Sequence, residues 1–160
     1  MATLPQLIEE DIERLNAALA EFLTQADATA ALVIDKGGFL IAHQGSEENL
    51  DFTTIGALAS GAFMANQTIA GLVNENNFDS IYQQGEQVSM VVSNIDEHCL
   101  LCVIFPSQSG VGVVKYFAGV AISRIAAQLA VAGARDPGNG LDLSELNLAD
   151  PQELFPKKAA

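Results

Sequence analysis

Apolar residues near the N-terminus recur at intervals of three and four, with acidic residues between them. The apolar set is Ile8, Ile12, Leu15, Leu19, Phe22 and Leu23, and the acidic set is Glu9, Glu10, Asp11, Glu13 and Glu21. This period predicts an α-helix with one buried face. Thr3 as a cap, Pro5 in the first turn and Gln6 reaching back predict that the helix begins at these residues.

Strand-like runs follow this helix. Residues 30–34 and 39–42, joined by Asp35-Lys36-Gly37-Gly38, predict a β-hairpin. Three more runs cover 78–84, 87–95 and 99–105. Because 30–34 and 99–105 are apolar on both faces, we expect them at the centre of the sheet. With strands numbered along the chain, the order 2-1-5-4-3 keeps every hairpin paired and leaves strands 2 and 3 at the edges.

The remaining pattern completes the predicted fold. A second helix lies between the hairpin and the later strands, and a third runs from about Ser109 to Ala134. We expect an α/β fold of the α+β type: a three-layer sandwich with helix 2 on one face of a five-stranded, mainly antiparallel sheet and helices 1 and 3 on the other. Residues 1–135 form this domain, and 136–160 form a C-terminal tail with a possible short helix at Asp150-Pro151.

One long stretch, from Phe52 to Asn74, contains no charged residue and no histidine. It has too many hydroxyl and amide groups for a membrane span. We expect Ile55, Leu58, Ala62, Ile69 and Leu72 to face the sheet. The opposite face then carries a stripe of small and uncharged residues, namely Gly56, Ser60, Met64, Gln67 and Gly71. This stripe predicts a seam between two copies of the helix; the alternative is an uncharged face in solvent.

The predicted edge strand supports the same interpretation. Ser80, Ile81, Tyr82, Gln83 and Gln84 include neither charge nor proline, the usual protection of an exposed edge. Together, the bare edge and the uncharged helix predict a two-fold homodimer with both elements in the interface.

The composition of the chain disfavours some classes of partner and indicates a cellular compartment. Seven Lys and Arg against twenty Asp and Glu give a net charge of −13, which disfavours nucleic acid and membrane surfaces as partners. The N-terminus lacks a signal-peptide pattern, and two cysteines in a strand-like run fit a reducing compartment, so we expect a cytoplasmic protein.

Candidate chemistry is sparse. Cys99 and Cys102 form a CxxC pattern, but residues three apart on a strand point to opposite faces, so we expect no metal site. Residues 110–115 lack the spacing of a phosphate-binding loop, and we predict no cofactor and no catalytic residues. Arg14, Arg124 and Arg135 are the only arginines; we interpret them as solvated surface residues rather than as an arginine finger.

The order of elements resembles the Roadblock family, which includes the dynein light chains of that name. Three segments carry the resemblance: Leu32 to Ala42 (LVIDKGGFLIA) is similar to the family's first hairpin, Ala57 to Leu72 to its small-residue helix, and Gly112-Val113-Val114 to the start of its last helix. The acidic chain with a C-terminal extension is similar to bacterial regulators of a Ras-like polarity GTPase. The resemblance implies a ten-stranded dimer with the GTPase docked over the paired second helices.

Three functions follow as hypotheses. The first is a homodimer that binds a small Ras-like GTPase and stimulates GTP hydrolysis without catalytic groups of its own. The second is a scaffold of the dynein-light-chain type with no effect on turnover, and the third, weaker one is a small-molecule sensor. On the first hypothesis, the candidates for partner contact are Ala57, Ala65, Thr68, Leu154 and Phe155.

Overall fold

The computed structural model describes residues 4–46 and 48–135 as three helices and five strands. The helices are α1 (Glu9–Ala26), α2 (Phe52–Leu72) and α3 (Val111–Gly133). The strands are β1 (Ala30–Asp35), β2 (Leu40–Gly45), β3 (Ser80–Gln83), β4 (Val88–Asn94) and β5 (Cys99–Pro106). The predicted tail, including Leu154 and Phe155, lies outside the described residues.

The strands form one antiparallel sheet in the order β2-β1-β5-β4-β3. β1 and β5 are paired over their length, from Ala30 opposite Ile104 to Asp35 opposite Cys99, and both are almost completely buried. The predicted order is therefore confirmed, because runs that are apolar on both faces occupy the centre of the sheet.

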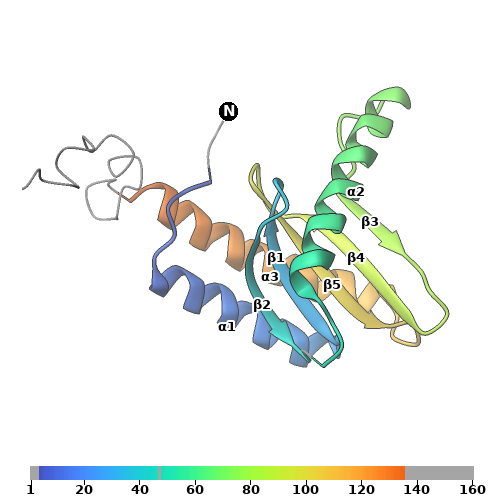
Figure 1. Cartoon of the computed structure of the whole chain (residues 1–160), viewed down its shortest axis with the longest axis horizontal. Coiled ribbons are helices and arrows are strands. Elements are labelled where there is room, and N and C mark those ends of the chain that lie inside the picture. Colours follow the sequence, from blue (N-terminus) through green and yellow to red (C-terminus); the bar gives the residue numbers. More distant parts are fainter. Residues whose placement is uncertain (1–3, 47, 136–160) are drawn as a thin grey trace, which may run out of the picture.

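Helices cover both faces of this sheet, as predicted (Figure 1). Leu15, Phe22, Val33, Phe105 and Ile125 belong to the larger core, which lies between the sheet and the α1/α3 pair. A smaller core lies beneath α2, with Leu32, Ile34, Phe63, Leu100 and Cys102 among its members. The alternation of side chains along each strand separates the two cores.

The start of α1 differs from the prediction. Pro5 and Gln6 precede the helix, which begins at Glu9 with Ile8 as the N-cap residue. Ile8 has no side-chain acceptor, but the Asp11 carboxylate accepts a hydrogen bond from the Ile8 backbone N–H at 2.9 Å. This contact is one of the two hydrogen bonds of a capping box, and it caps the helix at Ile8 rather than at the predicted Thr3.

The third helix has the predicted extent and packs against both the sheet and α1. Its buried side chains are Val114, Ala118, Ala121, Ile125, Leu129 and Ala132. Among the described residues it is also the one helix long and apolar enough, by length and composition, to cross a membrane, with a mean hydropathy of 1.3 over the relevant window. Its buried face belongs to the core of the domain.

Candidate interaction surface on α2 and β3

The start of α2 is fixed by Asp51. Its carboxylate accepts hydrogen bonds from the Thr54 backbone N–H at 3.1 Å and from the Thr54 hydroxyl at 2.6 Å. These bonds favour the ionised form and hold the pKa of the Asp51 carboxyl below its ordinary value. An acid at this position caps the backbone and suits the positive end of the helix dipole.

Small residues bring α2 close to the sheet. Gly56 is buried against β1, and a Cβ at this position would lie 2.9 Å from Cγ2 of Ile34. The buried Ser60 donates a hydrogen bond from its hydroxyl to the Lys36 carbonyl at 2.7 Å. Phe63 fills the space farther along this face of α2. The first two residues of the predicted stripe, Gly56 and Ser60, therefore face the sheet.

The orientation that we predicted for α2 is thus wrong. Gly56 and Ser60 face the domain's own core, whereas Leu58, Ile69 and Leu72 are 70, 47 and 79% exposed. The prediction assigned the larger apolar residues to the core. In the structure, the sheet lies so close to α2 at Gly56 and Ser60 that small residues fit there, while Leu58, Ile69 and Leu72 lie outside.

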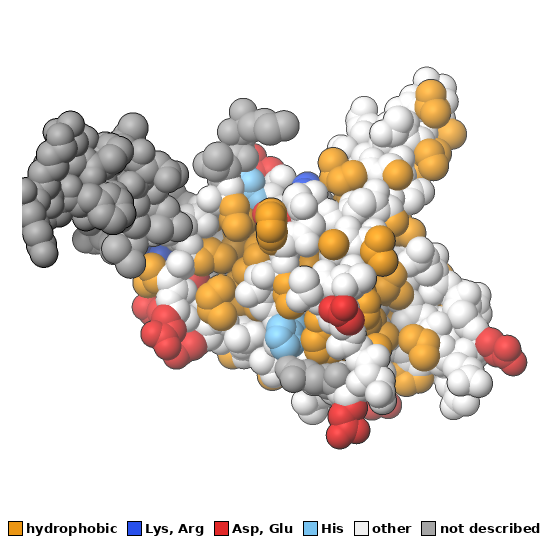
Figure 2. Space-filling model, viewed as in Figure 1, with side chains coloured by type: hydrophobic (Ala, Val, Ile, Leu, Met, Phe, Trp, Pro, Cys, Tyr) orange, Lys and Arg blue, Asp and Glu red, His pale blue; other side chains and the backbone are white. Residues whose placement is uncertain are grey.

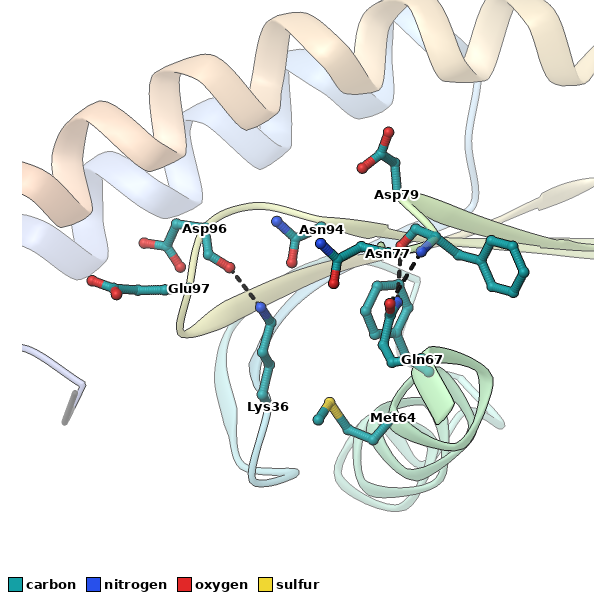
Figure 3. Close-up of a pocket in the computed structure, with 10 residues that line it drawn as sticks. Lys36, Met64, Gln67, Asn77, Asp79, Asn94, Asp96 and Glu97 are labelled. Atoms are coloured by element: carbon teal, nitrogen blue, oxygen red, sulfur yellow. Dashed lines mark hydrogen bonds between the residues drawn. The ribbon is translucent and has the colours of Figure 1, made fainter. Parts of the chain in front are cut away.

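Gln67 anchors the second half of α2 to the loop before β3. Its side-chain amide accepts a hydrogen bond from the Phe78 N–H at 3.0 Å and donates one to the Phe78 carbonyl at 2.8 Å (Figure 3). Gln67 was predicted to hydrogen-bond across a dimer seam, but both ends of its amide are used within the chain. Of the remaining stripe residues, Met64 and Gly71 are exposed.

An apolar groove lies beside α2. The helix packs mainly over β1, β2 and β5, which leaves the same face of β3 and β4 less covered. The groove has a volume of about 620 Å³ and is lined by Ile55, Leu58 and Ala62 of α2 and by Val88, Met90 and Ile104 of the sheet. Figure 2 shows hydrophobic side chains exposed along and beside α2.

The edge strand β3, which is four residues long, contributes Gln83 to the lining of this groove. Within the described chain, β3 is paired on one side, with β4. Ser80, Ile81, Tyr82 and Gln83 lie in the strand, and Gln84 follows it and also lines the groove. The outer edge therefore leaves backbone N–H and C=O groups available to another chain.

A second, more polar cavity of about 310 Å³ lies on the other side of α2. It is bounded by Phe63, Met64 and Gln67 of the helix and by residues near the β4–β5 turn. Lys36 extends across it and donates a hydrogen bond from Nζ to the Asp96 carbonyl at 2.8 Å (Figure 3). This contact joins the β1–β2 turn to the β4–β5 turn.

The cysteines lie apart, as their spacing predicted. Cys99 belongs to the α1/α3 core and Cys102 to the α2 core, on opposite faces of β5. Burial raises the pKa of both thiols to about 12, so both remain protonated. The described part of the chain brings together no group of three or more His, Cys, Asp or Glu residues that could hold a metal ion.

The arginines all lie in the α1/α3 layer. Arg14 pairs with Glu10 and Arg124 with Glu21 at the surface. Arg135 is different from the predicted solvated residue: it lies 2.8 Å from the fully buried Asp11 carboxylate, which Gln128 also contacts. Sequence reasoning missed this cluster because Gln128 and Arg135 each lie more than a hundred positions from Asp11.

Comparison with known proteins identifies the architecture. The model of the Roadblock/LC7 domain matches residues 15–105, from within α1 to the end of the sheet. The chain belongs to this family. Its hairpin, α2 and central strands fall within the matched region, while α3 follows it.

Solved structures resemble a larger share of the chain than the family model matches. An MglB with a tetrameric arrangement is 28% identical, with a TM-score of 0.75 over 82% of this chain and 99% of that one. The gliding protein MglB of Thermus thermophilus is 29% identical, with a TM-score of 0.72 over 81% and 98%. Myxococcus xanthus MglB, at 24% identity and a TM-score of 0.76 over 82% and 98%, shares the fold. No curated protein sequence matches the chain.

Proposed function

We propose that this Roadblock protein is a non-catalytic homodimer that binds a small Ras-like GTPase and stimulates its GTP hydrolysis. The uncharged, apolar surface of α2 beside the open edge of β3 carries this proposal. The likeness to MglB supports it, because the sequence resembles the bacterial regulators of a polarity GTPase. We also propose that the protein acts in the cytoplasm, where a small Ras-like GTPase would be its partner.

The dimer uses a different set of α2 residues from the one expected at first. Leu58 and Ala62, which line the groove, share one exposed side of the helix with Ala65, Ile69 and Leu72, because the five are spaced at three and four. In a two-fold dimer, each of these rows packs against its copy while the two β3 edges pair. Ala57 and Thr68, both exposed, remain available to the GTPase on the outer side of the helices.

Stimulation works through the position of the partner's switch loops. The three arginines lie in the layer opposite α2, and each is paired with an acid of α1. An arginine finger is therefore unavailable to a GTPase docked over α2. The surface instead holds the switch segments in the arrangement competent for hydrolysis.

The first test addresses the dimer. Leu58→Asp places a charge in the apolar row, and we expect it to separate the α2/β3 dimer while the domain stays folded. Phe39→Asp is the matched control, because Phe39 is 74% exposed in the β1–β2 turn, outside the groove. Mass by multi-angle light scattering and far-UV circular dichroism measure both outcomes. A Leu58→Asp protein that keeps the wild-type mass contradicts this interface.

The second test addresses the GTPase. We expect wild-type protein to accelerate phosphate release by a Ras-like GTPase encoded in the same genome, and Leu58→Asp to lose this effect while Phe39→Asp keeps it. Binding without any change in turnover would contradict stimulation. It would instead favour a scaffold, for which the bare β3 edge is suited because it can pair with an extended peptide.

A further inference from the structure

The polar cavity beside the second half of α2 is separate from the apolar groove, because the two share no lining residue. Met64 lines the cavity and is exposed. Ala57, Met64 and Thr68 are spaced seven and four residues apart, so they follow one side of the helix. Ala57 and Thr68 are the α2 residues that we propose for contact with the GTPase. The cavity therefore lies beside that contact surface and not in the proposed dimer interface.

Lys36 gives this cavity a positive charge. Among the residues that the structure describes, it is the one lysine or arginine on the α2 side of the sheet, since the others lie on α1, on α3 or directly after α3. Its ammonium donates a hydrogen bond to the Asp96 carbonyl at 2.8 Å and forms no ion pair with a described carboxylate. Because an ammonium has three N–H donors, two remain for another group.

The backbone of Lys36 is held from two sides. The Ser60 hydroxyl donates a hydrogen bond to the Lys36 carbonyl at 2.7 Å, and the Lys36 N–H donates one to the His98 carbonyl at 2.8 Å. The side chain is half-buried. An ammonium held in this way is suited to receive a group that enters the cavity, because little conformational freedom is lost on binding. It is not suited to extend into the nucleotide site of a partner, as an arginine finger does.

The side chains that face Lys36 suit a carboxylate ligand. Figure 3 shows the side-chain amides of Asn77 and Asn94 directed toward the space beside the ammonium. Neither amide is hydrogen-bonded to another side chain or backbone group within the described part of the chain. Each can therefore turn its NH₂ group toward an acceptor, which adds to the donors of Lys36. Hydrogen bonds from an ammonium to a carboxylate are stronger than those between neutral groups.

The acids around the cavity make their contacts away from the ammonium. The Asp96 carboxylate accepts hydrogen bonds from the His98 and Cys99 backbone N–H groups, each at 2.8 Å. Glu97 lies 3.2 Å from the His98 ring. Figure 3 shows both carboxylates, and that of Asp79, turned away from the Lys36 ammonium.

These acids still determine the source of the ligand. They surround the cavity with negative charge, in a chain whose net charge is −13. A free small anion is therefore repelled over most approaches. A carboxylate on a partner that already contacts α2 has a high effective concentration at the cavity, and it can bind there despite this repulsion.

We propose that Lys36, together with Asn77 and Asn94, binds the carboxylate of an Asp or Glu side chain on the docked GTPase. This inference rests on the proposed function and adds a contact that fixes the orientation of the partner over α2. The cavity volume of about 310 Å³ accommodates such a side chain, and Phe63 and Met64 provide an apolar wall for its methylene groups. Lys36 is thus a positioning residue for the GTPase and not a catalytic one.

The first experiment compares two lysines. Lys36→Gln removes the cation from the cavity, and Lys115→Gln removes an exposed cation from α3, so both change the net charge equally. Binding of each full-length protein to the GTPase, loaded with a non-hydrolysable GTP analogue, is measured over a range of salt concentrations. We expect Lys36→Gln to raise the Kd about tenfold and to weaken its salt dependence. Lys115→Gln should change the Kd by less than about twofold, because an exposed charge far from the contact is screened.

The second experiment identifies the carboxylate. Each surface Asp or Glu of the GTPase is replaced by Asn or Gln, and its binding to the wild-type and Lys36→Gln proteins is compared in double-mutant cycles. We expect one acid whose replacement weakens binding to the wild-type protein about tenfold and has no further effect on binding to Lys36→Gln. A role of Lys36 confined to the structure of the two turns would give no such coupling.

The outcomes separate this inference from the proposed function. If the wild-type protein binds the GTPase and Lys36→Gln binds it equally well, or if no acid is coupled to Lys36, the inference is overturned and the proposed function stands. If the wild-type protein does not bind the GTPase, both are overturned. Thermal stabilisation of the wild-type protein by free L-glutamate that Lys36→Gln abolishes, without a coupled acid on the GTPase, would assign the cavity to a small metabolite and also overturn the inference.

Discussion

The two long helices α2 and α3 are both almost free of charge, yet they are held to the domain in different ways. α2 packs directly on the sheet through Gly56 and Ser60, and its polar contacts go to backbone groups of the hairpin and of the loop before β3. α3 also packs on the sheet, but its polar contacts go to charged side chains of α1.

This difference shows that a helix can lack charged residues for two separate reasons. On α2, small residues lie where the helix approaches the sheet closely, whereas Leu58, Ile69 and Leu72 are exposed. On α3, the neighbouring helix provides the acids, so the side that turns away from both α1 and the core is left apolar. We therefore expect the packing of α2 on the sheet to depend mainly on side-chain volume. The packing of α3 on α1 should depend in part on charged side chains.

The largest effect should come from removing volume beneath α2. Phe63 is 2% exposed, so Phe63→Ala should lower the free energy of unfolding by about 4 kcal/mol through lost burial and a cavity. Denaturant titration measures the loss. Hydrogen exchange should also show the amides of α2 opening first, because this layer is one helix thick. Phe22→Ala, at a 1% exposed site under α1, is the control: if it opens α2 equally, the two layers are not independent.

The charge beneath α3 should give an intermediate effect. Asp11→Asn weakens the contacts to Arg135, Gln128 and the Ile8 N–H and should cost about 2 kcal/mol near neutral pH. The hydrogen bonds from Arg135 hold the pKa of Asp11 well below its ordinary value, against the effect of burial. The contribution is therefore present above about pH 4, the unfolded-state value, and is lost as the pH falls toward the folded-state pKa.

Stability curves measured from pH 3 to 7 check this expectation. The difference between wild type and Asp11→Asn should shrink as the solution becomes more acidic. Glu13→Gln, an exposed neighbour on α1, should show no such pH-dependent difference from wild type. A constant gap between the Asp11→Asn and wild-type curves would show that the Asp11 carboxylate does not carry its charge into the folded state.

The smallest changes in stability should come from alanine substitutions at two glycines of α2, and they should have opposite signs. An alanine Cβ at Gly56 would lie 2.9 Å from Ile34, whereas one at Gly61 would meet nothing within 4 Å. Gly56→Ala should lose about 1 kcal/mol through overpacking, net of its gain in helix propensity. Gly61→Ala should gain up to about 1 kcal/mol. Thermal unfolding of both variants measures the contrast, and equal shifts would contradict the close approach of α2.

Sequence patterns were sufficient for the sheet because its constraints are local. The Lys36-Gly37-Gly38 turn, the short gaps between later strands and the two doubly apolar runs fix which strands pair and which lie inside. The bounds of α3 follow similarly from the glycines before it and the Pro-Gly segment after it. These features depend on residues close together along the chain.

The missed features depend on tertiary packing. The sequence of α2 has apolar residues on two sides, and either side could face the sheet. The close approach of Gly56 to the Ile34 side chain is a tertiary contact that distinguishes them. Likewise, the Asp11 carboxylate that accepts a hydrogen bond from the Ile8 N–H at the start of α1 is held by Arg135, which lies 124 positions later. Neither contact can be read from a local stretch of sequence, so Gly56 and Ser60 were predicted to face away from the sheet, whereas both are buried against it.

The buried thiols have a practical consequence for spectroscopy. Cys99 and Cys102 are the chain's two cysteines, and both stay protonated and shielded inside the sheet. A fluorophore or spin label directed to an introduced surface cysteine should therefore react there selectively, with the native residues left in place. Distances between labelled copies, or between a labelled copy and its partner, can be measured on an otherwise unaltered core.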